Sequence, residues 1–236
     1  MKKILIFIIP FISFICHSQT YERGGFSNVG TGNSSIVNYT NLSDGIIGNR
    51  YFSDSWSIGF LEINDTIKSP QAKIQYDLVN GDLLIGTEKN KNGFVILDNS
   101  VTGFLMEIES GKKYFTKIKK SDFVDNNSIE KKFFLNPYPN TDKVYLLIDY
   151  KKILSNPTAA RNGYTNTSLN SRYKKYTRHY ILNANNKFVQ VRLKEKDILK
   201  VFSDKKKELK KYIKSNNLNL KKENDAVKLV AYYHTL

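Results

Sequence analysis

Short apolar or alternating runs, separated by turn residues, recur along residues 56–193. In residues 72–79 apolar and polar side chains alternate, so one face of a strand would pack against a core while the other faces solvent. A sheet with one solvated face is typical of antiparallel folds, because the strands of doubly wound parallel sheets are buried on both faces. The pattern therefore predicts an antiparallel β-domain over residues 46–193, as an open sheet or a partly open barrel.

Turn residues divide this β-domain into its expected strands. The strands are expected at residues 56–63, 72–79, 82–86, 94–97, 101–108, 113–118, 132–135, 144–150, 178–182 and 187–193. Asn80-Gly81 predicts a two-residue type I′ hairpin turn, because both residues tolerate a positive φ. Ser110-Gly111 and residues 183–186 predict two later hairpins.

A polar segment interrupts the pattern at residues 156–175. It contains Pro157, Gly163 and several Asn, Thr and Ser residues, and it has no apolar period. Loops of this length are usually either functional or disordered, and the residues favour neither. We therefore expect a long loop here.

The apolar pattern becomes helical after Leu193. Ile198, Leu199 and Phe202 would share one helix face. Ser203 is placed to cap a second helix, and the spacing from residue 227 onward predicts a last one. The expected fold class is α+β, with two or three C-terminal helices over residues 194–236 packed against the β-domain.

The N-terminus has the layout of a secretory signal peptide over residues 1–18. Two lysines precede an apolar run at residues 4–15 that is too short to span a bilayer with its flanks. The expected cleavage lies between Ser18 and Gln19. It leaves a mature chain whose residues 19–45 form a leader rich in Gly, Asn and Ser.

A lipoprotein signal is the alternative interpretation of the same segment, with Cys16 as the acylated residue. It is disfavoured because Phe14 and Ile15 are bulky where such a motif requires small residues. No later segment approaches the roughly 20 apolar residues of a transmembrane helix. We therefore expect an exported protein, in the periplasm or at the cell surface, without a transmembrane segment in its mature chain.

Removal of the signal peptide would leave no cysteine and two histidines, His179 and His234. This inventory excludes cysteine nucleophiles, thiolate zinc sites and disulfides. We expect neither a metal ion nor another cofactor.

The chain has a formal net charge of +15, and loss of Lys2 and Lys3 would leave +13 (15 − 2) on the mature protein. Its cations comprise 31 lysines and 6 arginines, although arginine is the usual reader of phosphates and bases. Together with export, this composition argues against a nucleic-acid partner. The charge is explained either by a coding bias toward lysine or by an anionic envelope component as partner.

Two groups of residues are candidate contact surfaces. Tyr51, Phe52 and Trp56 lie close together at the start of the β-domain. Exposed aromatic residues often stack on sugars or anchor a partner, although core packing explains these three equally well. Lys206 and Lys210 belong to the lysine-rich second helix and would attract an anionic surface.

The two ends of the chain carry a resemblance to a known family. The first segment comprises Gly48-Asn49-Arg50-Tyr51-Phe52, Trp56, Gly59, Asn64-Asp65, Ile74-Gln75-Tyr76-Asp77 and Asn80, and the second comprises residues 202–213, Leu218, Leu220, Asp225 and Tyr232-Tyr233. Together they resemble a family of uncharacterised secreted Bacteroidetes-type envelope proteins. The resemblance implies export and a β-rich domain with terminal helices, and it implies no catalytic residues.

The function expected from these features is binding, without catalysis, to an envelope protein or to an anionic envelope component. The alternative is a secreted hydrolase in which His179 acts as a general base. It requires His179 and an acidic residue to converge in a concave pocket. Neither a nucleophile elbow nor a His-x-x-His spacing accompanies His179 or His234.

Overall fold

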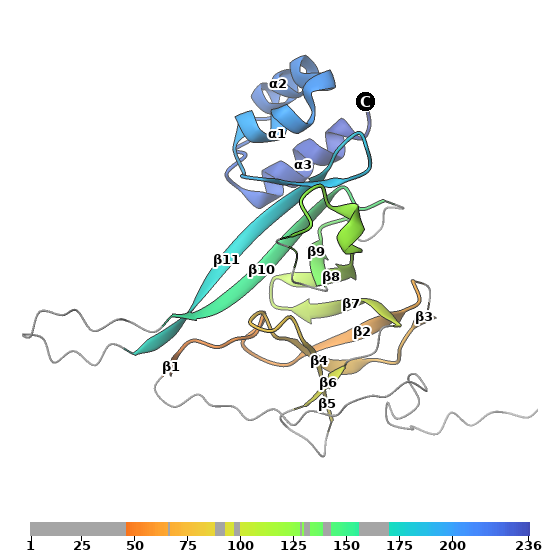
Figure 1. Ribbon diagram of the computed structural model, residues 1–236, viewed down its shortest axis with the longest axis vertical. Coiled ribbons are helices and arrows are strands. Elements are labelled where there is room, and N and C mark those ends of the chain that lie inside the picture. The colour runs from red at the N-terminus through yellow and green to blue at the C-terminus, as the bar shows by residue number, and fades with distance from the viewer. Residues whose placement is uncertain are drawn as a thin grey trace, which may run out of the picture. The chain divides into compact units, whose positions relative to one another are not determined.

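The chain forms a long β-sheet followed by three helices (Figure 1). The computed structural model describes residues 46–65, 67–87, 93–96, 100–127, 129, 133–138, 143–155 and 170–236. The strands are β1 (Ile46–Ile47), β2 (Ser57–Ile63), β3 (Ile67–Lys68), β4 (Ala72–Tyr76), β5 (Leu83–Gly86), β6 (Phe94–Ile96), β7 (Val101–Ile108), β8 (Gly111–Lys117), β9 (Phe133–Asn136), β10 (Leu146–Ser155), β11 (Ser171–Leu182) and β12 (Phe188–Val191). The helices are α1 (Glu195–Val201), α2 (Lys206–Ser215) and α3 (Glu223–Tyr233), with single 3₁₀ turns η2 (Lys120–Asp122) and η3 (Ser203–Lys205). The expected α+β class, a β-sheet followed by C-terminal helices, is confirmed.

The strands pair into one 12-stranded sheet in the order β1-β11-β10-β9-β8-β7-β2-β4-β5-β6. Outside this path, β12 pairs with β11 and β3 pairs with β2. Among the described strands every pairing is antiparallel except that of β1 with β11. The sheet is open, because β6 at one end and β1 at the other are not joined to each other.

Aromatic rings fill the core where the central strands pass one another. Phe104 stacks on Phe115 with ring centroids 4.7 Å apart, and Phe133 and Tyr76 meet Phe104 edge-on at 5.1 and 5.3 Å. Phe104 of β7 and Phe115 of β8 are direct partners in the register of the sheet. Directly paired residues point to the same face, so their rings meet on one side of the sheet. Edge-to-face and stacked aromatic pairs add to the stabilisation that burial provides.

Strands β10 and β11 form a long two-stranded ribbon, paired from Leu146 with Ile181 to Ser155 with Arg172. Figure 1 shows the ribbon running from beneath the helices to its far end beside β1. The half near the helices is buried, whereas exposed and half-buried residues dominate the far half. The ribbon therefore contributes to the core at one end and presents side chains to solvent at the other.

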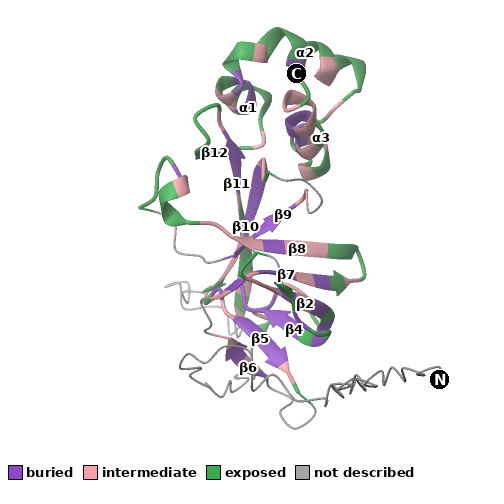
Figure 2. Ribbon diagram, turned by 90° about the vertical axis from the view of Figure 1, so that its right-hand side faces the viewer, coloured by how far each residue is buried: buried purple, intermediate pink, exposed green. Residues whose placement is uncertain are grey.

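The three helices pack against one another and against the end of the ribbon. Leu209, Leu229 and Val230 are fully buried between them, and the outer side of α2 is exposed (Figure 2). The rings of Tyr145, which precedes β10, and His234 stack with centroids 3.8 Å apart. This contact joins the end of α3 to the sheet. Within the described residues, no helix is long and apolar enough to cross a membrane.

All three expected hairpins form, and two of them have the expected turns. Ile108 pairs with Gly111 at the β7–β8 turn, where Gly111 has a φ of +99°. At the β11–β12 turn the Asn183 N–H donates to the carbonyl of Lys187, and Asn186 has a φ of +54°. Glycine and asparagine tolerate the left-handed backbone that such turns require.

The expected type I′ turn at Asn80-Gly81 is wrong. Gly81 has a positive φ, +78°, and Asn80 does not. The Asp77 carboxylate accepts hydrogen bonds from the N–H groups of Val79 and Asn80, and its other oxygen lies 2.7 Å from Arg50 Nε. The buried Asp77 thus imposes a longer turn stabilised by its own side chain.

Ser203 does not cap the second helix. It begins the 3₁₀ turn η3, and α2 begins at Lys206 without a side-chain capping bond. Phe202 is fully buried and stacks on Tyr233 at 3.8 Å. Because this ring is held in the core, the backbone turns tightly after it before α2 starts.

The polar segment differs in part from its expected loop. Its residues 156–169 lie outside the described residues, as do residues 1–45 with the predicted cleavage site at Ser18 and Gln19. Residues 171–175, however, belong to β11. They have no apolar period because both faces of this half of the strand carry polar side chains, and pairing with β10 holds them in the sheet.

Candidate functional site

Tyr51 and Trp56, which the sequence predicts as contact residues, pack against other side chains. Tyr51 is 7% exposed and forms a small apolar cluster with Leu84 and Val95, against which the half-buried Trp56 packs. Gly93 contacts the same indole, and an added methyl group at this position would overlap it. The structure does not test a binding role for Tyr51 or Trp56, but their rings already have neighbours in the fold.

Phe52 differs from these two residues because it lines a groove. Its ring meets that of Phe115 edge-on at 5.0 Å and lies 5.5 Å from that of Tyr150. The groove has a volume of about 280 Å³ and lies between the sheet and the start of α3. Polar residues of its lining include Lys112, Lys113, Asn136, Tyr150, Glu223 and Asn224.

Lys206 and Lys210 are exposed on α2, one helical turn apart. The buried face of this helix is held by Leu209, and Tyr212 stacks on Tyr232 at 3.9 Å. Both lysines are therefore free to contact a partner electrostatically. Their surface is distinct from the cluster that contains Tyr51, so the structure does not join the two predicted contact groups into one surface.

A hydrogen-bonded cluster links the ribbon to the start of α3. His179 Nε2 lies 3.1 Å from Glu223 Oε1, and the Tyr150 hydroxyl donates to Glu223 Oε2 at 2.8 Å. His179 is buried at 9% exposure, whereas the Glu223 side chain is 35% exposed toward the groove. Because an ionised carboxylate only accepts hydrogen bonds, Nε2 of His179 carries the proton in this contact.

The environment of Glu223 favours its charged form. The hydrogen bond from His179 lowers the pKa of Glu223, burial opposes this effect, and the hydrogen bond from Tyr150 lowers the pKa further. Burial, reinforced by the neighbouring Glu223, raises the pKa of Tyr150 well above its ordinary value. Tyr150 is therefore a hydrogen-bond donor at all physiological pH values, and Glu223 is an acceptor.

The cluster partly meets the requirement of the hydrolase hypothesis. His179 and an acidic residue do converge, and Glu223 lines the groove, whereas His179 is not part of its lining. Glu223 also begins α3, where a negative charge is favourable beside the unpaired N–H groups of the first turn. The arrangement therefore anchors α3 to the ribbon, and it offers one carboxylate to the groove.

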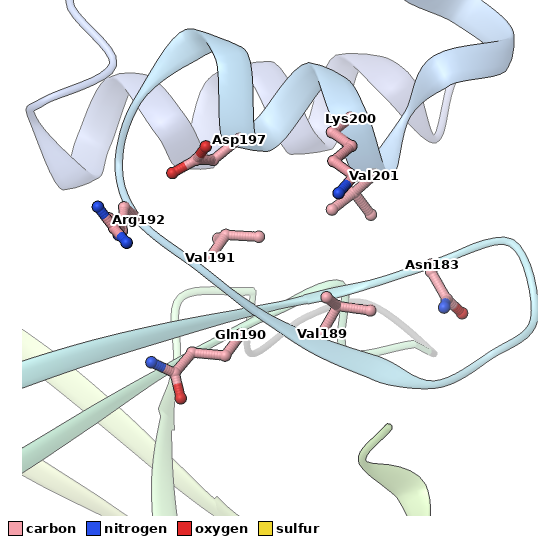
Figure 3. A pocket seen from close by; sticks show the side chains of 8 residues that line it. All are labelled: Asn183, Val189, Gln190, Val191, Arg192, Asp197, Lys200 and Val201. Atoms are coloured by element: carbon pink, nitrogen blue, oxygen red, sulfur yellow. The ribbon is translucent and has the colours of Figure 1, made fainter. Parts of the chain in front are cut away.

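A second hollow, of about 570 Å³, lies between β12 and α1 (Figure 3). Figure 3 shows Val189 and Val191 pointing toward the helix and Gln190 pointing away from it. Asp197 lies at one end of the hollow and Lys200 at the other. The residues that line this hollow include one carboxylate, that of Asp197, and no histidine, so the lining offers no histidine–acid pair.

The far half of the ribbon carries a surface that sequence reasoning missed. Arg172, Lys174, Tyr176 and Arg178 alternate along β11 and so share one face. Their partners on β10 add Lys151, opposite Tyr176, and Ile153, opposite Lys174. We call this surface the cationic ribbon face; it comprises Lys151, Ile153, Arg172, Lys174, Tyr176 and Arg178. Residues 172–178 are rich in Arg, Lys and Tyr, but no alternation assigns them to one face, so no pattern in the sequence marked this surface.

Cations on the opposite face of the ribbon have structural roles. Lys152 Nζ donates to the carbonyl oxygens of Asn49 and Tyr51 at 3.0 and 2.5 Å, and burial lowers its pKa. Lys175 Nζ lies 4.0 Å from the centroid of the Tyr150 ring. By contrast, Arg172 and Lys174 are exposed, and within the described part of the chain neither forms an ion pair.

Neither a search for metal-binding clusters nor comparisons with known proteins indicate a function. Among the described residues, no group of three or more His, Cys, Asp or Glu side chains is placed to hold a metal ion. A scan against protein-family models and searches of the curated proteins and of the solved structures find no match to this chain.

Proposed function

We propose that this chain is an exported cell-envelope protein that works by binding an anionic partner and not by catalysis. Export rests on the signal-peptide pattern that ends at Ser18, as does a periplasmic or surface location. Binding rests on the cationic ribbon face, where cations and exposed apolar side chains share one strand surface. Lys206 and Lys210 of α2 add to the long-range attraction.

An anionic envelope component is favoured over an envelope protein as the partner. The exposed charges of the cationic ribbon face and of the α2 lysines are positive, which suits a ligand with many negative charges. The predicted aromatic contact residues Tyr51 and Trp56 pack within the fold, so the proposed attraction is mainly electrostatic. A protein partner would instead require a buried apolar centre to its interface.

The test is retention of the protein, purified after expression of the full chain, on an isolated envelope fraction with crosslinking. We expect retention at low salt and release at high salt, because the Debye length falls from about 10 Å at 0.1 M to about 3 Å at 1 M. If one defined protein is captured and stays bound at high salt, the partner is that protein and not an anionic envelope component. The absence of retention at any salt concentration would overturn the proposal.

The second candidate is a secreted hydrolase that uses His179. The observation that favours it is the contact of His179 with Glu223 beside the groove. In this hypothesis the carboxylate would orient the imidazole, as in known acid–base pairs. The burial of His179 and the second hydrogen bond that Glu223 accepts from Tyr150 favour a structural role instead.

An assay on chromogenic esters and glycosides separates the two candidates. The binding proposal expects no turnover by the wild-type protein. The hydrolase hypothesis predicts turnover by the wild-type protein and a rate about a hundredfold or more lower in His179→Gln, which is the size of a general-base contribution. Thermal unfolding of His179→Gln is the control, because loss of turnover counts only if the variant remains folded at the assay temperature.

A further inference from the structure

We propose that the cationic ribbon face binds a linear acidic polysaccharide that carries carboxylate groups. The inference rests on the proposed function, and it names the surface and the ligand class. It starts from the strand period. Side chains two residues apart on one face of a strand are about 6.6 Å apart, so Arg172, Lys174, Tyr176 and Arg178 form a row along β11.

Strand β10 widens this row into a two-stranded surface. Ile153 lies beside Lys174 and Lys151 lies beside Tyr176 in the register of the ribbon. The carboxylate on this face nearest the core, Asp149 opposite Arg178, is 5% exposed. Among the described residues of this face, the exposed charged side chains are those of Arg172 and Lys174, and both are positive.

Exposed apolar groups distinguish this surface from an ordinary solvated one. Tyr176 is 50% exposed and Ile153 is 45% exposed, although both lie on regular strands. Ile47 of the neighbouring β1 pairs with Arg172, so it lies on the same face, and it is 56% exposed. Apolar side chains gathered at one exposed place, among charged ones, mark an interaction site more often than isolated apolar residues do.

The chemistry of the row matches an acidic sugar chain. The Arg172 guanidinium can bind a carboxylate through two parallel hydrogen bonds, and Lys174 supplies a point charge. The Tyr176 ring offers an apolar face and a hydroxyl to a sugar ring, and Ile153 extends that apolar contact. A row of cations along a strand suits a linear polymer with regularly repeated charges.

A nucleic acid and the α2 lysines are the competing explanations. Proteins that bind single-stranded nucleic acids stack successive bases on several aromatic rings, whereas this face carries a single one, Tyr176. The lysines of α2, including Lys206 and Lys210, give charge, but the apolar side of that helix faces inward through Leu209. Its exposed surface therefore offers no sugar-stacking ring between the charges.

The experiment measures binding of the protein, purified after expression of the full chain, to alginate, a linear polyuronate, at 0.15 M salt. Two variants each remove two positive charges: Arg172→Gln with Lys174→Gln on the ribbon, and Lys206→Gln with Lys210→Gln on α2. We expect the ribbon variant to bind about tenfold or more weakly and the α2 variant to change affinity less than about twofold. Tyr176→Ala is expected to weaken binding about threefold to tenfold without changing the salt dependence.

Several outcomes would overturn the inference. Equal losses of alginate affinity in the two double variants would show that binding depends on net charge and not on the cationic ribbon face. Tighter binding of a thymidine oligonucleotide than of alginate, through the same residues, would make the surface a nucleic-acid site. Retention on the envelope fraction without affinity for alginate would reject the polysaccharide but leave the proposed function standing. Thermal unfolding checks that each variant is folded, and neutral dextran is the uncharged control ligand.

Discussion

Replacing Phe104 with alanine is expected to lower the free energy of unfolding by about 3–5 kcal/mol, the range for truncating a buried phenylalanine. Phe104 is fully buried, stacks on Phe115 and meets Phe133 and Tyr76 edge-on. Alanine would remove these contacts and leave a cavity at the centre of the sheet. The strands on either side are held by backbone pairing, so they would close the cavity only in part.

Urea unfolding measures this loss as a lower midpoint with an unchanged slope. Tyr176→Ala is the matched control, because it also truncates an aromatic ring on a strand, at a position that is 50% exposed. It should change the free energy of unfolding by no more than about 0.5 kcal/mol. Similar losses in the two variants would contradict the central position of Phe104 in the aromatic core.

Replacing Glu223 with alanine is expected to cost about 2 kcal/mol at neutral pH, because it removes the acceptor of two partly buried donors. These donors are His179 and Tyr150, both on the ribbon, whereas Glu223 is the first residue of α3. The loss should appear first as loosened α3, which hydrogen exchange measures as faster exchange of amides in that helix. Tyr150→Phe removes one of the two bonds and should cost about 1 kcal/mol.

The same cluster gives the stability a defined dependence on pH. The pKa of Glu223 is lowered in the folded protein, so the folded state binds its proton more weakly than the unfolded state does. Its contribution is therefore fully present above the ordinary pKa of 4.5 and is lost as the pH falls through the lowered value. The stability difference between wild type and Glu223→Gln should be largest at neutral pH and shrink below about pH 4.

Unfolding by urea at a series of pH values tests this prediction. Glu208→Gln is the control, because Glu208 is an exposed carboxylate on α2 and its removal should change stability little at any pH. A difference between wild type and Glu223→Gln that stays constant from neutral to acidic pH would show that the charge of Glu223 does not stabilise the contact with the ribbon.

The candidate site was only partly accessible from the sequence. His179 stands out as one of two histidines left after the signal peptide, and Lys206 and Lys210 stand out by charge. Glu223 and Tyr150 do not stand out, because Glu223 lies 44 residues from His179 and 73 residues from Tyr150 along the chain. Their meeting depends on where α3 docks on the ribbon. No local sequence pattern predicts where α3 docks.

Tyr51 and Trp56 illustrate the same limit for aromatic residues. Their types are compatible with either a contact surface or a core, and the sequence leaves both open. Pairing of Tyr51 with Asp77 and its packing against Leu84 and Val95 place its ring inside. The neighbours of an aromatic residue are set by the order of the strands, which is a property of the whole sheet.

The sequence by itself determined local features, namely where strands, turns and helices form. The apolar run in residues 101–108 predicts β7 with its observed bounds, and the glycine after Ser110 predicts the turn that follows. The helical spacing after Leu193 predicts two or three C-terminal helices, and the structure has three in this region. These predictions succeed because burial of one face and the backbone freedom of turn residues act over a few neighbouring positions.

What only the tertiary structure decided is which distant residues meet. Residues 171–175 are polar on both faces and have no apolar period, yet they are a strand because β10 pairs with them along the ribbon. The cationic ribbon face exists through that pairing, since it joins Lys174 to Ile153 across two strands. Backbone hydrogen bonds to a partner strand can stabilise a segment that buries little apolar surface. Side-chain periodicity therefore predicts where a core forms, whereas pairing between strands decides which side chains share an exposed surface.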